Sequence, residues 1–330
     1  MLTISIVNYF GGTLLYNCIR SVVEHTRGID YEIIVVDNSN DPESKSPVIA
    51  GFPAVRWIHM DDNAGFGRAN NVAFREAQGD AVLLLNPDCI AESNVVADCY
   101  RRLMQSGHAA CGVNIVNEDG SFQISGNYAM TGGLNYLLPL PYLGSFMKWL
   151  GTLFRVEKPH LADPGREKIV DWINGAFLMV KKDIVDRTGG FDEDFFLYAE
   201  EAEWCSRIRR YGTLCIWGDL SIKHLQGAIA TTAFGGESNS YKVLHDKKGR
   251  QLMLSNLVRI RKEFGLGWFA VILFFFTLTI PVYFIGGLLH SVVTCRNQLK
   301  HFTGFSYNII KLYPFLPFII RNKRKFYKVL

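Results

Sequence analysis

The sequence predicts an α/β fold: a Rossmann-like, mostly parallel sheet with helices on both faces, followed by C-terminal helices that associate with a membrane. Three observations support this prediction. Short β-branched runs alternate with amphipathic stretches through the first hundred residues, strand and helix patterns resume after residue 169, and the tail is apolar and basic. Continuous apolar strands between helices are typical of a parallel sheet that is covered on both faces.

The elements follow in order along the chain. In the first hundred residues, apolar runs predict strands over 2–7, 31–36, 55–59 and 81–85, and amphipathic stretches predict helices over 12–24 and 67–77. In the second block we expect a strand over 170–180, helices over 182–188 and 200–211, and a strand over 213–222. The Gly-, Pro- and aromatic-rich residues 122–163 predict loops or a lid over the site.

Charge divides the 330-residue chain into a body and a tail. Residues 264–330 hold 8 Lys and Arg and no Asp or Glu, whereas residues 1–263 hold 27 Lys and Arg against 31 Asp and Glu. An acidic body argues against a nucleic-acid partner, and a basic apolar tail suits an anionic lipid surface. We therefore predict a globular domain over residues 1–250 and a membrane-associating helical tail over residues 251–330. The sequence does not indicate an oligomeric state.

The cysteines and the first residues bear on the compartment. An odd number of cysteines, 7, without a CxxC pair, argues against a disulfide framework or a structural zinc site and favours a reducing compartment. The strand pattern begins at Leu2 without a basic segment before it, so no signal peptide is predicted.

Polar residues follow the ends of four predicted strands. Because the carboxyl ends of parallel strands meet at one edge of a sheet, we expect these side chains to share a crevice. The alternative is that each one caps a helix or forms a turn. The residues are Asn8, Asp37, Asn38, Asn63, Asn86 and Asp88.

Asp88 follows a buried strand and a proline turn, which suits a carboxylate that binds Mg²⁺ or Mn²⁺ beside a diphosphate. The segment from Asn63 to Asn71 is a glycine turn that opens a helix. It can place Gly67, Arg68 and Asn71 near phosphate. As a dinucleotide-binding motif G-x-G-x-x-G it is weak, because Asn70 stands in place of the third glycine.

A second acidic cluster follows the turn at Gly189 and Gly190. Glu200, Glu201 and Glu203 can complement a helix dipole, but after the aromatic loop that contains Phe191 and Asp192 they also suit a general base beside an acceptor. His224 alone is more typical of a core or surface histidine than of a ligand.

These segments occur in a fixed order over residues 2–230, and the set resembles the family 2 inverting glycosyltransferases of the GT-A fold, in particular the rhamnosyltransferase-like branch of bacterial polysaccharide synthesis. The matching segments are Ile4–Asn8, Val36–Ser39, Asn63–Asn71, Leu84–Asp88, Gly175–Met179 and Gly189–Tyr198. The resemblance implies a nucleotide-sugar donor, Asp37 at the base or ribose, Asp88 as the metal carboxylate and His224 as a further metal or diphosphate contact.

The family has a Glu-Asp pair whose Asp is the catalytic base. The resemblance aligns this pair with Glu200-Glu201 and so implies that Glu201 is the base. The sequence departs from the family here, because Glu201 stands where an Asp is expected and Glu203 stands where the Asp two residues later is expected. Two alternatives therefore stay open: a non-catalytic relative that binds or scaffolds a glycan carrier, and a sugar-phosphate nucleotidyltransferase. The second usually has a basic glycine-rich loop after the first strand, and residues 8–13 contain no Lys or Arg.

The tail contains an uncharged stretch of 26 residues, 268–293, that is long enough to span a membrane. Pro281 and Gly286-Gly287 argue against one straight helix, and basic residues flank both ends. We expect a broken or re-entrant pair of helices, with residues 305–320 in the interface and both ends cytoplasmic. The resemblance implies a lipid-linked acceptor, so residues 264–330 would hold the protein at the cytoplasmic face of the bacterial inner membrane. The alternative is a core helix of a soluble protein.

Overall fold

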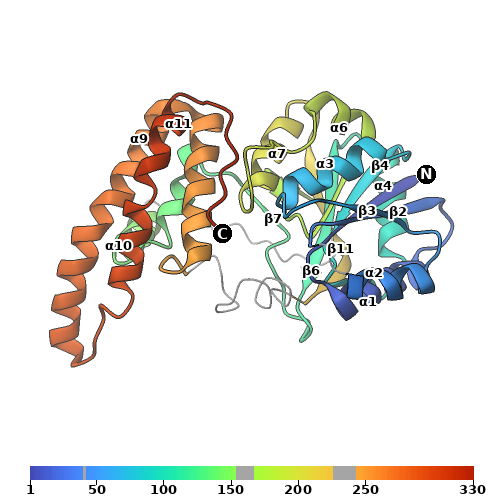
Figure 1. Ribbon diagram of the computed structural model, residues 1–330. Coiled ribbons are helices and arrows are strands. Elements are labelled where there is room, and N and C mark those ends of the chain that lie inside the picture. Colours follow the sequence, from blue (N-terminus) through green and yellow to red (C-terminus); the bar gives the residue numbers. More distant parts are fainter. Residues whose placement is uncertain (40–41, 154–166, 226–242) are drawn as a thin grey trace. The chain divides into compact units, whose positions relative to one another are not determined.

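The computed structural model describes residues 1–39, 42–153, 167–225 and 243–330, and the chain divides into two compact units (Figure 1). The first, which we call the sheet unit, comprises residues 1–128, 159–196 and 200–235. The second, the hairpin unit, comprises residues 129–158, 197–199 and 236–330. The division of the chain at residue 250 into a catalytic domain and a tail stays a prediction.

The sheet unit is built on a mixed sheet in the order β3-β2-β1-β4-β10-β6-β11-β5, with β8 paired to β11. The first four strands in this order are parallel, and β10 is antiparallel to both of its neighbours. A two-stranded sheet joins β7 to β9. The strands are β1 Leu2–Asn8, β2 Tyr31–Asp37, β3 Arg56–His59, β4 Ala81–Leu85, β5 Cys89–Ile90, β6 Ala110–Val116, β7 Gly126–Asn127, β8 Glu167–Val170, β9 Trp172–Ile173, β10 Phe177–Lys181 and β11 Leu214–His224.

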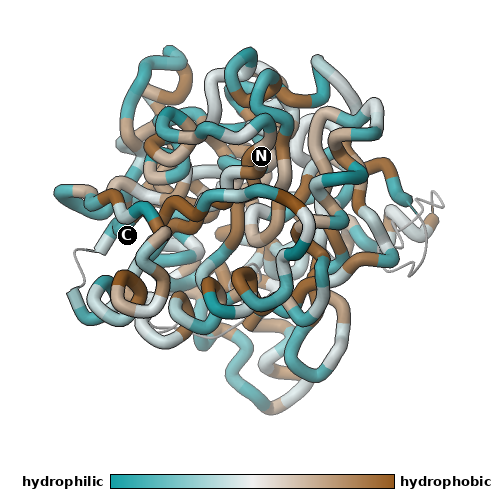
Figure 2. Tube along the Cα trace, turned by 90° about the vertical axis from the view of Figure 1, so that its right-hand side faces the viewer, coloured by the Kyte–Doolittle hydropathy of each residue, from teal (hydrophilic) through white to brown (hydrophobic). Residues whose placement is uncertain are grey.

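Helices cover both faces of this sheet, as predicted. Buried side chains of α1 (Gly12–His25), α2 (Pro42–Gly51) and α4 (Val95–Gln105) pack on one face. Those of α3 (Phe66–Glu76), α6 (Lys182–Thr188) and α7 (Glu200–Ile208) pack on the other. Figure 1 shows α1 and α2 on the side of the sheet opposite α3 and α6, and the hydropathy-coloured trace in Figure 2 shows hydrophobic segments through the middle of the unit.

Two predictions for the middle of the chain are wrong. The single strand expected over residues 170–180 is divided into β8, β9 and β10, because Asn174 forms a turn between β9 and β10: its side chain accepts a hydrogen bond from the Ala176 N–H, and its carbonyl accepts one from the Phe177 N–H. Residues expected as loops form a 3₁₀ segment, η1 (Thr131–Leu137), and a helix, α5 (Leu143–Leu153). Residues 154–163 of that prediction are outside the described residues.

The hairpin unit is dominated by α9 (Lys247–Thr294), against which α10 (Phe302–Ile310) and α11 (Leu316–Ile320) pack, with η2 (Tyr313–Phe315) between them. The helix continues through Pro281, Gly286 and Gly287, where a break was expected. The break is instead at Gly265, whose φ of +87° is left-handed. The two later glycines have packing roles, since a Cβ would lie 3.1 Å from the Tyr142 ring at Gly286 and 2.4 Å from Leu299 at Gly287.

Candidate active site

The carboxyl ends of β1 and β2 place Asn8 and Asp37 side by side, because these residues are register partners. The Asn8 side-chain amide donates to Asp37 Oδ1 over 3.0 Å, and the Ser39 hydroxyl donates to the same oxygen over 2.8 Å. His59 Nδ1 lies 3.7 Å from the other carboxylate oxygen. Asn8 and Asp37 are buried, so the structure confirms that these strand-end residues converge.

Asn38 and Asn63 shape the adjoining turn. Asn38 donates to Asn63 Oδ1 over 3.0 Å and accepts from the Ala64 N–H over 2.9 Å, and Asn63 Oδ1 also accepts from the Gly65 N–H. These bonds hold the glycine turn that opens α3. Both side chains therefore have the structural role that the capping alternative predicted, at the same edge of the sheet as Asp37.

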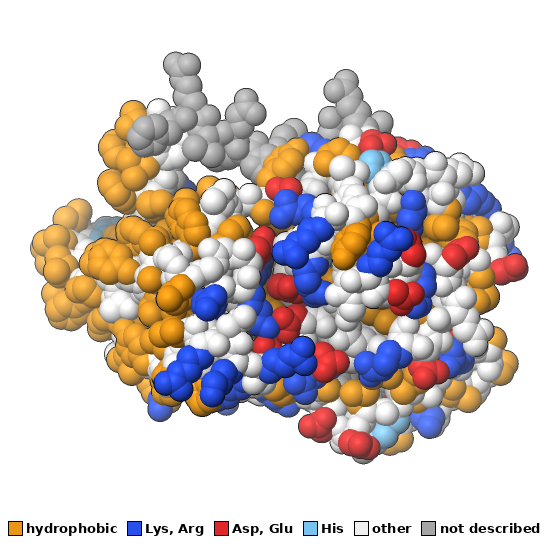
Figure 3. Space-filling model, turned by 90° about the horizontal axis from the view of Figure 1, so that it is seen from above, with side chains coloured by type: hydrophobic (Ala, Val, Ile, Leu, Met, Phe, Trp, Pro, Cys, Tyr) orange, Lys and Arg blue, Asp and Glu red, His pale blue; other side chains and the backbone are white. Residues whose placement is uncertain are grey.

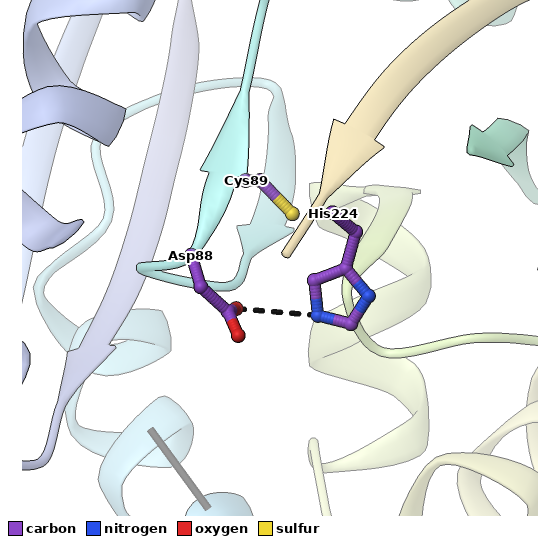
Figure 4. A group of neighbouring side chains, drawn as sticks. All are labelled: Asp88, Cys89 and His224. Carbon is purple, nitrogen blue, oxygen red and sulfur yellow. Dashed lines mark ion pairs between the residues drawn. The ribbon is translucent and has the colours of Figure 1, made fainter. Parts of the chain in front are cut away.

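Asp88 and His224 form the second centre of the site (Figure 4). Asp88 comes from the turn after β4, and His224 ends β11 opposite Cys89 in the antiparallel pair of β11 and β5. Asp88 Oδ1 lies 3.2 Å from His224 Nε2, and the Asn86 amide nitrogen lies 3.3 Å from the same Nε2. Both Asp88 and His224 are buried. The structure thus brings together three residues that the sequence predicted at a metal or diphosphate site.

The donor atoms present here fit a divalent cation. Ligand atoms of Asp88, Cys89 and His224 lie within 4.8 Å of one another. Burial, followed by the charge of Asp88, raises the pKa of the Cys89 thiol well above its usual value, and a protonated thiol is a poor ligand. The remaining pair is a carboxylate, which suits Mg²⁺ and Mn²⁺, and an imidazole, which suits transition metals. Which of Mg²⁺ and Mn²⁺ binds here stays a prediction.

The three glutamates at the start of α7 have different environments. The Glu203 carboxylate accepts from Arg207 Nε and Nη2 over 2.8 and 2.7 Å, so it belongs to an ion pair. Glu200 is 3% exposed, and its Oε2 has no hydrogen-bond partner among the described residues. Burial, followed by the neighbouring Glu201 charge, raises the pKa of Glu200 well above its ordinary value. Glu201 is the one of the three that is only half-buried.

Gly175 connects the glutamates with the turn that carries Asp88. A Cβ at Gly175 would lie 3.9 Å from Glu201 Cβ and 3.3 Å from the Phe66 ring. The next residue, Ala176, accepts a hydrogen bond through its carbonyl from the Asn86 N–H over 3.0 Å. The start of α7 and the turn after β4 therefore both lie against this short segment, which brings the predicted base and the predicted metal ligand to one region.

Several residues predicted to bind donor or acceptor have structural contacts instead. Phe191 is 2% exposed and packs with Phe66, Phe74 and Trp204, so it is a core residue and not a surface for an acceptor. Asn71 bonds both the N–H and the carbonyl of Phe191, which uses its amide to fix that loop. We therefore assign Phe191, Asn71 and the ion-paired Glu203 to the fold.

Gly67, Arg68 and Asp192 have contacts in the same region. A Cβ at Gly67 would lie 3.0 Å from Phe191 Cβ, so this glycine permits close packing of α3 on the loop. Arg68 Nε donates to the Glu193 carbonyl over 2.8 Å, and Asp192 accepts from the Asp194 N–H. Ligand binding by these three residues stays a prediction.

The sheet unit has the GT-A fold, as comparison with solved structures shows. The solved structures that the chain resembles include a mannosyltransferase of Pyrobaculum calidifontis in complex with GDP-Man and Mn²⁺, at a TM-score of 0.53, 13% identity and coverage of 98% of this chain and 87% of that one. Another is GalNAc-T7 with UDP, GalNAc and Mn²⁺, at a TM-score of 0.51, 15% identity and coverage of 82% and 55%. These likenesses show the fold alone.

The sequence comparisons point to one family. Residues 3–162 match the model of Glycosyl transferase family 2, so this part of the chain is similar to that family. It is 29% identical to the low-salt glycan biosynthesis hexosyltransferase Agl10 of Haloferax volcanii, over 63% of this chain and 62% of that protein. It is 27% identical to the N-acetylglucosaminyl-diphospho-decaprenol L-rhamnosyltransferase of Mycobacterium tuberculosis, over 56% and 63%. The chain thus spans about three-fifths of the length of these relatives.

Proposed function

We propose that the protein is an inverting glycosyltransferase that moves a sugar, with rhamnose as the first candidate, from a nucleotide-diphosphate donor to a hydroxyl of a lipid-linked or polysaccharide acceptor in cell-surface glycan synthesis. The observation that carries this proposal is the buried pair of Asp88 and His224 at the edge of the sheet, 3.2 Å apart, in a chain similar to Glycosyl transferase family 2. The choice of sugar rests on relatives named as rhamnosyltransferases.

In this proposal the donor lies along the carboxyl ends of the strands. Asp37, held by Asn8 and Ser39, contacts the base or ribose. Asp88 and His224, with Asn86 next to them, would hold Mn²⁺ or Mg²⁺. A divalent cation bound there would offset the negative charge that develops on the leaving diphosphate.

Glu201 is the general base in this mechanism. The acceptor hydroxyl oxygen attacks the anomeric carbon from the face opposite the diphosphate, Glu201 takes the hydroxyl proton, and the bond between the anomeric carbon and the diphosphate oxygen breaks. The contacts of its neighbours support this choice, because Glu203 is paired with Arg207 and the buried Glu200 favours its protonated form. Single displacement requires one carboxylate and inverts the anomeric configuration.

The hairpin unit supports a membrane-bound location at the cytoplasmic face of the bacterial inner membrane, where nucleotide sugars are available. An 18-residue window of α9 has a mean hydropathy of 2.3, and only 28% of this window is buried. A core helix of a soluble protein would be mostly buried. Figure 3 shows a broad surface of hydrophobic side chains with Lys and Arg gathered along one edge. Large exposed apolar residues on α9 include Phe274, Ile285, Leu289, Val292 and Val293.

A transfer assay tests the proposed function. The protein in detergent is supplied with Mn²⁺, dTDP-rhamnose or other UDP-, GDP- and dTDP-sugars, and a polyprenyl-diphosphate-linked N-acetylglucosamine acceptor. We expect release of nucleoside diphosphate that depends on the acceptor, and a product with the opposite anomeric configuration. If every donor is bound but none is turned over, the non-catalytic relative is the better description. Exchange of a sugar phosphate with a nucleoside triphosphate would instead indicate the nucleotidyltransferase.

A further inference from the structure

A short hairpin after β6 places Gln123 against the imidazole of His224. The turn closes through a hydrogen bond from the Asn117 N–H to the Ser121 carbonyl, and Gly120 has the left-handed φ of +80° that the turn requires. After the turn, the Gln123 N–H donates to the Ile115 carbonyl over 2.8 Å. The backbone of Gln123 is therefore fixed to β6, which is a neighbour of β11 in the sheet.

The side-chain amide of Gln123 has a defined orientation. Its nitrogen donates to the backbone carbonyl of His224 over 2.7 Å and to Asn117 Oδ1 over 2.7 Å, which uses both of its hydrogens. A flipped amide would place an oxygen against the His224 carbonyl oxygen. The oxygen of Gln123 must therefore be the atom that lies 2.8 Å from His224 Nδ1. An amide oxygen accepts only, so Nδ1 carries the hydrogen.

This arrangement determines what the other ring nitrogen offers. In a neutral imidazole with hydrogen on Nδ1, Nε2 has a free lone pair. Asp88 Oδ1 lies 3.2 Å and the side-chain amide nitrogen of Asn86 lies 3.3 Å from Nε2. Donation from the Asn86 amide agrees with a lone pair on Nε2. A carboxylate oxygen that faces this lone pair is repelled by it, and a cation held between the two would remove the repulsion.

We propose that Gln123 is a positioning residue that fixes the tautomer and the ring orientation of His224, so that the Nε2 lone pair points to the position shared with Asp88. The cation part of this proposal rests on the proposed function, in which these two residues hold a divalent metal. Residues that orient a metal-ligating histidine typically change metal affinity by about 10–100-fold when they are removed. Gln123 lies in the segment for which the sequence predicted loops or a lid.

Two variants and a matched control test the proposal. Gln123→Leu removes the acceptor, whereas Gln123→Glu keeps an acceptor for Nδ1 but loses the two donated hydrogen bonds. Gln105→Leu makes the same substitution at an exposed position on α4. The ¹⁵N chemical shifts of the His224 ring in the metal-free protein report the tautomer, and titration with Mn²⁺, alone and with UDP, GDP and dTDP, reports affinity by electron paramagnetic resonance.

We expect wild type and Gln105→Leu to show hydrogen on Nδ1. In Gln123→Leu the tautomers should mix and Mn²⁺ affinity should fall by about 10–100-fold. Gln123→Glu should retain the tautomer, with an intermediate loss of affinity. An unchanged tautomer and unchanged affinity in Gln123→Leu would overturn the proposal. If the tautomer changes as expected but wild type binds no Mn²⁺ under any condition, the proposed cation site fails and the positioning of His224 stands.

Discussion

At the scale of single residues, Asp88 offers a direct test of the cation site. Asp88→Asn keeps the size of the side chain and a polar contact to His224 Nε2, which lies 3.2 Å away, but removes the charge that a cation needs. We expect transfer to fall by about 10²–10³-fold, the range found when one electrostatic stabiliser of a transition state is lost. Thermal unfolding should stay near that of wild type. Asp98→Asn, at a half-exposed ion pair on α4, is the control. Near-wild-type turnover of Asp88→Asn, with EDTA also harmless, would contradict the metal assignment.

The catalytic base is tested by the glutamates at the start of α7. Glu201→Gln is almost isosteric and cannot accept the proton, so kcat should fall by about 10²–10⁴-fold while donor binding is retained. Glu203→Gln removes the ion pair with Arg207 and should mainly lower the unfolding temperature. The two variants are compared by kcat, donor affinity and thermal unfolding. If Glu203→Gln is the variant that loses kcat, the base is two residues later than proposed.

Glu200 makes stability depend on pH. Its pKa is raised in the folded protein by burial and by Glu201, so above the ordinary titration range of glutamate, near about 4.3, the folded state binds more protons than the unfolded state. Stability contributed by this group is fully present below that range and is lost as pH rises toward the folded pKa. We expect the unfolding temperature of wild type to decline over this interval relative to Glu200→Gln, which does not titrate. Parallel curves of unfolding temperature against pH for the two proteins would contradict the raised pKa.

Some of the site residues could be predicted from the sequence and others could not, for a physical reason. Asn8, Asp37, Asn86 and Asp88 follow strand ends, and the carboxyl ends of neighbouring strands must meet. Asn71 and Phe191 lie 120 residues apart, and nothing local indicates that the amide of one bonds the backbone of the other. Gln123 was missed as well, although the Asp119-Gly120 pair between two apolar segments is a hairpin signal that could have placed it.

At the scale of elements, the bounds of helices and strands with one clear hydrophobic period were predicted within one or two residues. Examples are β1, β4, α1, α3 and α6. The division of residues 170–180 depends on the hydrogen bonds of Asn174, which no pattern of hydropathy shows. Pro281 and Gly286-Gly287 predicted a break in the helix, but α9 continues through them. A long apolar helix tolerates them where neighbouring side chains pack closely, as Tyr142 and Leu299 do against the two glycines.

The turn that opens α3 depends on a residue without a side chain. Gly65 has a φ of +82°, and a Cβ there would lie 2.1 Å from the Phe196 carbonyl oxygen, which accepts from the Phe66 N–H. Gly65→Ala should lower the free energy of unfolding by about 2–4 kcal/mol, from backbone strain together with overpacking. Gly107→Ala, at a position with nothing within 4 Å, should change it by less than about 1 kcal/mol. Denaturant unfolding measures both, and equal values for the two variants would show that the close approach at Gly65 is not rigid.

At the scale of the whole molecule, the basic, apolar tail of the sequence belongs to the hairpin unit, and its helix α9 exposes large apolar side chains. Within the hairpin unit, the chain returns toward the start of α9: Gln251 bonds the backbone of Tyr327 and Val329. The start of α9 and residues 327–329 therefore lie together, and α10 and α11 pack back along the helix. A helical hairpin of this kind would keep both of its ends on one side of a bilayer, and the re-entrant topology stays a prediction.

Paired charges on the exposed face of α9 test membrane association directly. Phe274 and Ile285 are each 58% exposed and lie on the apolar part of the helix. An Asp at the centre of a membrane-embedded helix costs about 2.5–3.5 kcal/mol, so the double variant Phe274→Asp, Ile285→Asp should no longer float with vesicles of bacterial lipid. The control is Val23→Asp, Met104→Asp, with both residues 38% exposed on helices of the sheet unit, and it should float like wild type. Because all four side chains are exposed in the structure, thermal unfolding and donor binding in detergent should be retained in both variants. Flotation of the α9 variant, or a wild-type protein that fractionates with the cytosol at low salt without detergent, would contradict the membrane location.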